Sequence, residues 1–318
     1  MRTICRLPQW IGLATLGSRP STGNTALPSA FLPPHQPVQI VLPDSTAIPL
    51  VCDSPHSGTD YPADFGYAVP LADLRKSEDT HVQWLWNAVP TVGGTLVHAT
   101  FPRSYIDVNR HERDIDLTML ADAWPGEVAP SERCITLGNG LVFSQTTARS
   151  PIYARRLTAS EVAHRIESYW RPYRHALAHL LAGAAVRGPR WHLNLHSMPS
   201  NAYERLGRVA PGPLADVVLG DLNGSSCSAI FTEMVGRAFR SRGYTVAIND
   251  PYAGQDLLRE FGDPARGHES LQIELNRALY LNEQTRELLP RAQDLRDDIA
   301  GVLQDIAAHI RGVTNSHA

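Results

Sequence analysis

Cysteines are few in this 318-residue sequence, and none of them is spaced as a pair. The four that occur, Cys5, Cys52, Cys134 and Cys227, are far apart and form no CxxC motif. This spacing excludes the disulfide framework that is typical of small secreted proteins. We therefore expect a reducing compartment and predict a cytoplasmic location.

Long apolar runs and an excess of one charge are also missing. The formal net charge of −3 comes from 29 basic and 32 acidic residues spread along the chain. The sequence therefore predicts no membrane span and lacks the electrostatic footprint of a nucleic-acid-binding protein. With 43% hydrophobic and 19% charged residues, the composition is that of a soluble globular protein, for which we expect a small-molecule partner.

The common signatures of hydrolases and nucleotide-binding proteins are absent as well. The sequence contains no HExxH, no GxSxG, no Walker A loop and no GxGxxG that opens a helix. These absences exclude the most easily recognised zinc peptidases, serine hydrolases and dinucleotide-binding folds. The site has to be found from residues that are dispersed along the chain.

The N-terminal 34 residues carry basic, Ser and Thr residues but no acid, as targeting segments do. The apolar stretch at residues 10–16 is short, however, and several prolines follow it. We therefore interpret residues 1–34 as an extension that is disordered. Residues 35–318 are predicted to form a single domain.

Strand-like and helix-like segments alternate along this domain. Short apolar runs predict strands, helical spacing of apolar residues predicts helices, and Thr158 with Glu161 forms a capping-box pattern. The expected strands cover 38–42, 48–52, 95–100, 104–108, 191–195, 217–219, 244–248 and 271–275, and the expected helices cover 82–89, 158–180 and 295–306. This order predicts an α/β fold with a mainly parallel or mixed sheet covered by helices on both faces. Residues 121–151, which have no sustained period, are predicted to be a functional loop.

Two histidines follow predicted strands, which is where ligands bind in open α/β sheets. His56 comes after the second strand, and His196 ends the strand at 191–195. A catalytic zinc ion takes three His or carboxylate ligands and leaves one position open, so this pair plus a carboxylate would suffice. Spacing alone leaves the alternative that both are hydrogen-bonded histidines at a sheet edge.

A set of short motifs makes the interpretation more specific. They are SPHSG at 54–58, SEDTH at 77–81, FPRSYIDVNR at 101–110, NLHSMPS at 194–200, LGDLNG at 219–224, NDPYAG at 249–254 and QIELNRALYLNE at 272–283. In order and spacing this set resembles the N-formylglutamate amidohydrolase family, from about residue 40 to residue 283. The resemblance implies a zinc-carboxypeptidase-like or aspartoacylase-like fold and a metal-dependent hydrolase that acts on linear amide bonds.

The resemblance also implies a ligand set for one zinc ion. His56 and His196 match the two histidine ligands, and Asp79 matches the carboxylate ligand. Thr59 stands where the carboxypeptidase pattern HxxE has its glutamate, so the carboxylate has to come from elsewhere. The adjacent Glu78 is the alternative to Asp79, and similar ligand sets accept other divalent metals.

The remaining roles follow from the same resemblance. Glu274 matches the general base that accepts a proton from zinc-bound water, and Arg103 would stabilise the oxyanion. Without the resemblance, Glu274 could equally form a salt bridge to Arg277, and Arg103 a surface ion pair. The residues implied for substrate binding are Asn109 and Arg110 on the α-carboxylate, Arg155 or Arg277 on a second carboxylate, and Tyr252 and Gly254 in the pocket wall.

The predicted reaction is hydrolysis of N-formyl-L-glutamate to formate and L-glutamate, as in histidine degradation. A first alternative keeps the chemistry but uses another N-acyl amino acid or a small peptide. A second is a metal-free binding module on the same fold, which the missing HxxE glutamate suggests. The sequence leaves the oligomeric state open.

Overall fold

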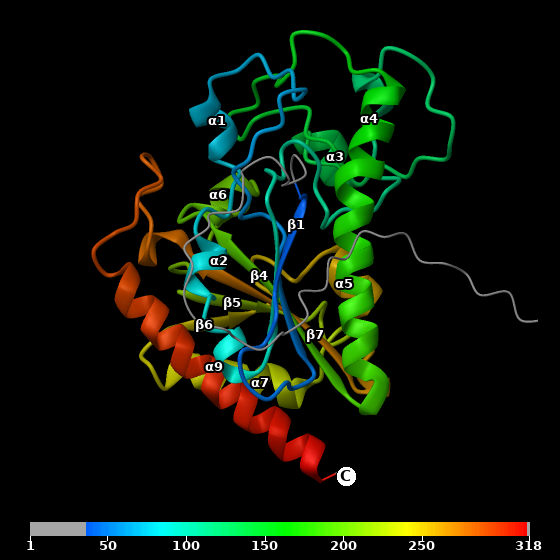
Figure 1. The fold of residues 1–318 in the computed structure, drawn as a ribbon. Coiled ribbons are helices and arrows are strands. Elements are labelled where there is room, and N and C mark those ends of the chain that lie inside the picture. The colour runs from blue at the N-terminus through cyan, green and yellow to red at the C-terminus, as the bar shows by residue number, and fades with distance from the viewer. Residues whose placement is uncertain (1–35, 317–318) are drawn as a thin grey trace, which may run out of the picture. The chain divides into compact units, whose positions relative to one another are not determined.

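The computed structural model describes residues 36–316, and all its named strands belong to one seven-stranded sheet (Figure 1). The strand order is β1-β3-β2-β4-β7-β5-β6. Strands β3, β2, β4 and β7 run parallel, β1 is antiparallel to β3, and β5 and β6 run antiparallel to β7. The predicted α/β class with a mixed sheet is confirmed. The extension predicted for residues 1–34 lies outside the described residues.

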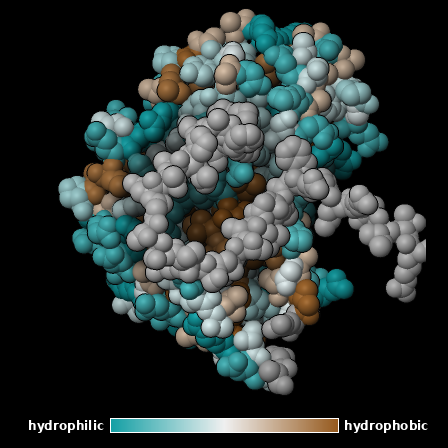
Figure 2. Space-filling model, viewed as in Figure 1, coloured by the Kyte–Doolittle hydropathy of each residue, from teal (hydrophilic) through white to brown (hydrophobic). Residues whose placement is uncertain are grey.

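The strands agree with most of the predicted ones. Their bounds are β1 Val38–Val41, β2 Leu50–Ser54, β3 Thr95–Ala99, β4 Arg190–Met198, β5 Val217–Gly220, β6 Val246–Ile248 and β7 His268–Asn276. Strand β4 extends beyond the prediction, so that His196 lies within the strand and not at its end. The edge strand β1 exposes Ile40 and Val41, and a hydrophobic area lies where β1 runs in an otherwise mostly hydrophilic view (Figure 2).

Helices cover both faces of the sheet, as expected. The α-helices are α1 Leu71–Arg75, α2 Val82–Leu85, α3 Glu132–Leu137, α4 Ala159–Arg165, α5 Arg171–Ala184, α6 Ala202–Arg205, α7 Ala229–Arg240, α8 Asp256–Phe261 and α9 Ala292–Asn315. A π-helical segment, Ile166–Trp170, joins α4 to α5, and 3₁₀ turns lie at Pro90–Val92, Leu117–Met119, Ala185–Arg187, Pro264–Arg266 and Arg277–Leu279. Helices α2, α7 and α9 share one hydrophobic core with the sheet, and α4, α5 and α8 share the other. Among residues 36–316, no helix combines the length and apolar character needed to cross a bilayer.

The central strands have two very different faces. On β4, Leu193 and Leu195 point into the core that α9 covers, whereas His192, Asn194 and His196 alternate with them and face the other way. The neighbouring strand β7 follows the same alternation, with Ile273 in the α9 core. A row of buried polar side chains therefore crosses the middle of the sheet.

Two local predictions are wrong. Residues 104–108 form turns and not a strand, although Tyr105 and Ile106 are fully buried, and the backbone N–H of Asp107 donates to the carbonyl of Leu141 in the long loop. Buried apolar character alone had suggested the strand. Helix α2 is also shorter than the expected helix at 82–89, and its N-cap residue, His81, makes no side-chain capping hydrogen bond. The predicted capping box of Thr158 and Glu161 is confirmed.

Gly58 allows the loop after β2 to pack against the segment that follows β3. A Cβ atom at this position would lie 2.3 Å from the carbonyl carbon of Thr100 and 2.5 Å from the backbone nitrogen of Phe101. Neither backbone atom can move away without displacing the chain. The small residue therefore keeps the loop with His56 against the sheet.

We expect Gly58→Ala to lower the free energy of unfolding by about 1–3 kcal/mol, because the added methyl group overlaps backbone atoms. Urea denaturation measures this change. Gly183→Ala is the control, since nothing lies within 4 Å of a Cβ on this residue of α5, and the helix should gain about 0.5–1 kcal/mol. Equal effects of the two substitutions would contradict the explanation.

Candidate active site

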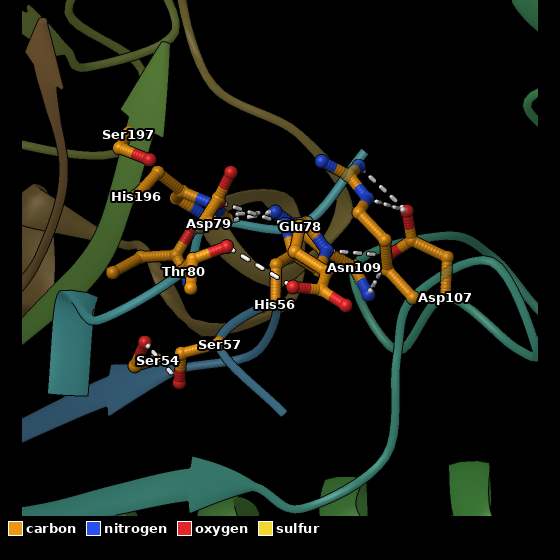
Figure 3. Close-up of polar contacts among 12 residues, drawn as sticks. Ser54, His56, Ser57, Glu78, Asp79, Thr80, Asp107, Asn109, His196 and Ser197 are labelled. Carbon is orange, nitrogen blue, oxygen red and sulfur yellow. Dashed lines mark hydrogen bonds and ion pairs between the residues drawn. The ribbon is translucent and has the colours of Figure 1, made fainter. Parts of the chain in front are cut away.

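Three buried side chains that are distant in sequence meet at the end of the central strands. His56 follows β2, Asp79 lies in the turn between α1 and α2, and His196 belongs to β4. The Oδ2 atom of Asp79 lies 3.1 Å from His196 Nδ1 and 3.4 Å from His56 Nδ1. The three side chains point toward one another (Figure 3) and offer ligand atoms that all lie within 4.8 Å of one another.

The other nitrogen of His56 is held by Asp107. The distance from His56 Nε2 to Asp107 Oδ1 is 2.7 Å. Burial would raise the pKa of Asp107, but the charges of Arg103 and Arg110 and the hydrogen bond from His56 outweigh burial and hold that pKa well below its usual range. The ionised carboxylate can only accept, so Nε2 carries the proton and donates it. In the neutral ring, Nδ1 then presents a lone pair to the centre of the site.

The same logic applies to His196 through Asn194. Asn194 Oδ1 lies 2.6 Å from His196 Nε2, and Asn194 Nδ2 donates to Asp53 Oδ1 at 2.7 Å. The buried carboxylate of Asp53 therefore fixes which end of the amide faces His196. Because that end is the carbonyl oxygen, Nε2 of His196 is the donor and Nδ1 presents its lone pair.

Asp53 is itself held in place by several donors. His192 Nε2 lies 2.8 Å from its Oδ1, and the hydroxyl of Tyr173 donates to its Oδ2 at 2.7 Å. Burial would raise the pKa of Asp53, but the hydrogen bonds from His192, Asn194 and Tyr173 lower it below its usual value. Asp53 is thus an ionised anchor beneath the site.

The three converging groups fit a zinc ion. Asp79 is ionised, because burial is outweighed by its contacts with His196 and His56 and by the charge of Arg277, which hold its pKa well below the usual range. Burial lowers the pKa of His196, which favours the neutral ring. His56 Nδ1 is buried without a hydrogen-bond partner among the described residues. Ligand atoms around a tetrahedral zinc ion lie about 3.3 Å apart, close to the spacing here.

Glu78, the alternative ligand, points elsewhere. Its carboxylate accepts hydrogen bonds from Tyr61 at 2.6 Å and Thr80 at 3.0 Å, and it pairs with Arg75 at 3.3 Å. Thr59, at the position of the carboxypeptidase glutamate, is exposed and does not line the cavity. Asp79 is the carboxylate that faces the two histidines.

Glu274 lies beside this group on the neighbouring strand. Its Cα pairs with that of His196 in the β4–β7 ladder, and only 8% of the residue is exposed. Burial, reinforced by the charge of Asp79, raises the pKa of Glu274 to about 8, against the opposing charges of Arg103 and Arg277. Within residues 36–316, its carboxylate has no hydrogen bond or ion pair, so the salt bridge to Arg277 is not formed.

Arg103 contacts the site through Asp107. Its Nη2 and Nε donate to Asp107 Oδ2 at 2.7 and 3.1 Å, which links the guanidinium to the partner of His56. The side chain is 18% exposed and lines the cavity. Arg103 is therefore oriented by the same carboxylate that orients His56.

These groups line a cavity of about 150 Å³ together with most of the other predicted residues. The predicted substrate-binding residues in its wall are Asn109, Arg110, Tyr252 and Arg277. Arg155 lies outside it, is exposed, and pairs with Glu161 at 2.5 Å. Gly254 is also absent from the wall. It has a φ of +113°, and a Cβ there would lie 2.5 Å from Leu258 Cδ2, which explains the glycine by backbone conformation and packing.

Asn109 and Arg277 are already engaged with the protein. Asn109 Oδ1 accepts from the backbone N–H of Leu257, and its Nδ2 lies 3.3 Å from both Asn194 Oδ1 and His196 Nε2. Arg277 donates to Asp79 Oδ1 at 2.8 Å and is 3% exposed. Arg110 donates to the Gln255 side chain at 2.8 Å and to the carbonyl of Asn139, and burial lowers its pKa to about 10.

The sequence did not single out the residues that orient the histidines. Asp107 stood inside the motif IDVNR, and Asn194 inside NLHSMPS, but nothing in either motif marked them as hydrogen-bond partners. Asp53 and His192 were missed too. The alternation of polar and apolar residues along β4 was the available signal, because three buried polar residues on one strand face need partners.

The sequence matches the family model described as N-formylglutamate amidohydrolase over residues 48–281. It is 28% identical to the N-formylglutamate deformylase of Pseudomonas putida over 242 residues, which are 74% of this chain and 83% of that protein. The enzyme of the same name from Pseudomonas aeruginosa is 25% identical over 242 residues, which are 74% of this chain and 84% of that protein.

Solved structures give the same picture. The structure is similar to the crystal structure of N-formylglutamate amidohydrolase from Ralstonia eutropha JMP134, with 52% identity, a TM-score of 0.85, and coverage of 86% of this chain and 98% of that chain. A gene product from Agrobacterium tumefaciens is 15% identical with a TM-score of 0.58, covering 88% of this chain and 96% of that one. This second likeness concerns the fold alone.

Glu274→Gln tests the raised pKa of Glu274 in chelator-treated protein. A carboxyl with a pKa of about 8 when folded and 4.5 when unfolded contributes stability that is complete below 4.5 and is lost as the pH rises through about 8. The glutamine variant has no such loss. We therefore expect it to gain stability relative to the wild type from about pH 5 to about pH 9, as measured by urea denaturation. A difference that is independent of pH would contradict the raised pKa.

Proposed function

Because this chain belongs to the N-formylglutamate amidohydrolase family, we propose that it hydrolyses the formyl amide of N-formyl-L-glutamate to formate and L-glutamate. The observation that carries the proposal is the convergence of His56, Asp79 and His196 beside the unpaired carboxylate of Glu274. A metal site with an adjacent free base is an arrangement that can activate water for amide hydrolysis.

The charge of the cavity supports an anionic substrate. Its wall contains seven cationic side chains, namely Lys76, Arg103, Arg110, Arg133, Arg149, Arg205 and Arg277, and two carboxylates, those of Asp79 and Glu274. N-formylglutamate carries two carboxylates and no cation. The excess of positive charge therefore favours this substrate over an uncharged peptide.

We assign one zinc ion to His56 Nδ1, His196 Nδ1 and the carboxylate of Asp79. When bound there, zinc supplies Lewis acidity toward the formyl carbonyl oxygen and toward water. Asp107 and Asn194 hold the two imidazoles with Nδ1 inward, and Arg277 holds the other oxygen of Asp79. Partners of this kind orient metal ligands and stabilise the tautomer that binds the metal.

Glu274 is the proposed general base. It accepts a proton from the water whose oxygen adds to the formyl carbon, and it then gives a proton to the amide nitrogen as the C–N bond breaks. The absence of a hydrogen-bond partner within the described range leaves its carboxylate available for this transfer. Arg103 donates hydrogen bonds to the oxygen that becomes negative, and Arg110 binds the α-carboxylate.

We expect purified protein with zinc to release formate from N-formyl-L-glutamate, and Glu274→Gln to lower kcat by about 10²–10⁴-fold because proton transfer is lost. Formate is measured with a coupled dehydrogenase assay, and circular dichroism checks that the variant is folded. If the wild-type protein with zinc releases no formate from N-formyl-L-glutamate, the substrate assignment is wrong. Turnover of N-acetyl-L-glutamate at a higher kcat/KM would favour a different acyl group.

Matched substitutions of the two adjacent acids test the ligand set. Asp79 and Glu78 are both buried and each contacts an arginine, so their alanine variants remove a similar charge. We expect Asp79→Ala to weaken zinc affinity beyond the roughly 100-fold typical of a residue that only orients a ligand, and Glu78→Ala to change it far less. Zinc content and calorimetric titration measure both. Loss of zinc only in the Glu78 variant would assign the carboxylate ligand to Glu78.

A further inference from the structure

The second carboxylate of the proposed substrate needs a cation of its own, and the two arginines predicted for it are both engaged. Arg155 is exposed, pairs with Glu161 and lies outside the cavity. Arg277 is buried against Asp79. The cation that recognises the substrate side chain therefore has to be another residue of the cavity wall.

Most other cations of the wall also have partners within the protein. Arg103 pairs with Asp107, and Lys76 pairs with Asp73. Arg110 donates to Gln255. Arg149 donates to the carbonyl of Thr136, and Arg205 donates to Asn201 through Nε. Each of these side chains is at least partly satisfied without a ligand.

Arg133 differs from all of them. Its side chain forms no hydrogen bond and no ion pair with any residue in the described part of the chain, although its Nε is buried. Burial lowers the pKa of Arg133, because the nearby charges do not compensate for the loss of water. A guanidinium nitrogen that is buried without an acceptor, as the Nε of Arg133 is, is costly unless a ligand provides the acceptor.

The backbone around Arg133 is held by hydrogen bonds, and these fix the point from which its side chain enters the cavity wall. Arg133 is in the first turn of α3, whose N-cap Ser131 accepts from the backbone N–H of Cys134. Asp114 in turn accepts from the backbone N–H of Ser131 at 2.6 Å and from its hydroxyl at 3.0 Å. Tyr252, another residue of the cavity wall, also has no hydrogen bond within the described range.

We propose that Arg133 is the specificity-determining cation, which binds the side-chain carboxylate of an acidic N-formyl amino acid. The inference rests on the proposed function and adds the residue that selects the substrate class. A carboxylate can accept two parallel hydrogen bonds from the guanidinium, whereas a neutral side chain leaves the guanidinium without a charged partner. Discrimination against neutral analogues follows from this unpaired state.

The test compares two substrates of nearly equal shape, N-formyl-L-glutamate and N-formyl-L-glutamine, in zinc-loaded wild type and Arg133→Gln. We expect the variant to lower kcat/KM for the glutamate substrate by about 100-fold, the loss of a hydrogen-bonded charge pair, with little change for the glutamine substrate. Arg113→Gln is the matched control, since Arg113 is exposed, pairs only with Glu127 and lies outside the cavity.

Several outcomes would overturn the inference. An equal loss on both substrates would show that Arg133 supports the site in general, and a selective loss in Arg205→Gln but not in Arg133→Gln would assign the role to Arg205. Failure of the proposed function looks different, because then the wild type releases formate from neither compound.

A binding measurement covers variants that turn over too slowly. Calorimetry of N-formyl-L-glutamate with Glu274→Gln, and with the same protein carrying Arg133→Gln, should show about 100-fold weaker binding in the second. N-formyl-L-glutamine should bind both about equally. Arg133→Lys keeps the positive charge but loses the two parallel donors of the guanidinium. We therefore expect it to retain part of the preference for the glutamate compound over the glutamine compound. Unchanged affinity for the glutamate compound would overturn the inference without any catalytic readout.

Discussion

Three electron pairs directed at one point repel one another unless a cation lies among them, and this constraint organises the centre of the molecule. Asp107 and Asn194 each accept a hydrogen bond from the Nε2–H group of one histidine. Both Nδ1 atoms then face the ionised Asp79. The direction of Asn194 depends in turn on Asp53, a buried charge one strand away. A polar network through β2 and β4 therefore determines the chemistry at the strand ends.

The second general property of the site is a separation between chemistry and recognition. His196 and Glu274 are carried by β4 and β7, and His56 lies just beyond β2, so the proposed metal ligands and base depend on the sheet. Arg110 and Arg133 belong to segments without strands, between β3 and α4. These two arginines supply positive charge that suits an anionic ligand, and neither belongs to a strand of the sheet.

The sequence predicted the parts of the site that depend on strand ends. His56, His196 and Glu274 follow from apolar runs and short motifs, and all seven strands that form the sheet overlap their predicted ranges. The orienting contacts could not be predicted, because Asp107 and His56 are brought together by tertiary packing across 51 residues. Arg155 was predicted to bind a substrate carboxylate, but it forms an ion pair with the nearby Glu161 instead. Arg133 lies in the short helix α3, inside the region 121–151 where the sequence has no sustained period, so only the cavity revealed it.

The pairing of β4 with β7 fixes the distance between His196, a proposed metal ligand, and Glu274, the proposed base. Residues His196 and Glu274 stand opposite each other in a ladder whose register extends from Arg190 and His268 to Met198 and Asn276. If one of the two strands slipped by one residue, its side chain would turn to the opposite face, into the α9 core, while the other would stay in place. The separation of the proposed ligand and base is thus set by nine consecutive backbone pairs, which do not depend on the loops that carry the cavity arginines.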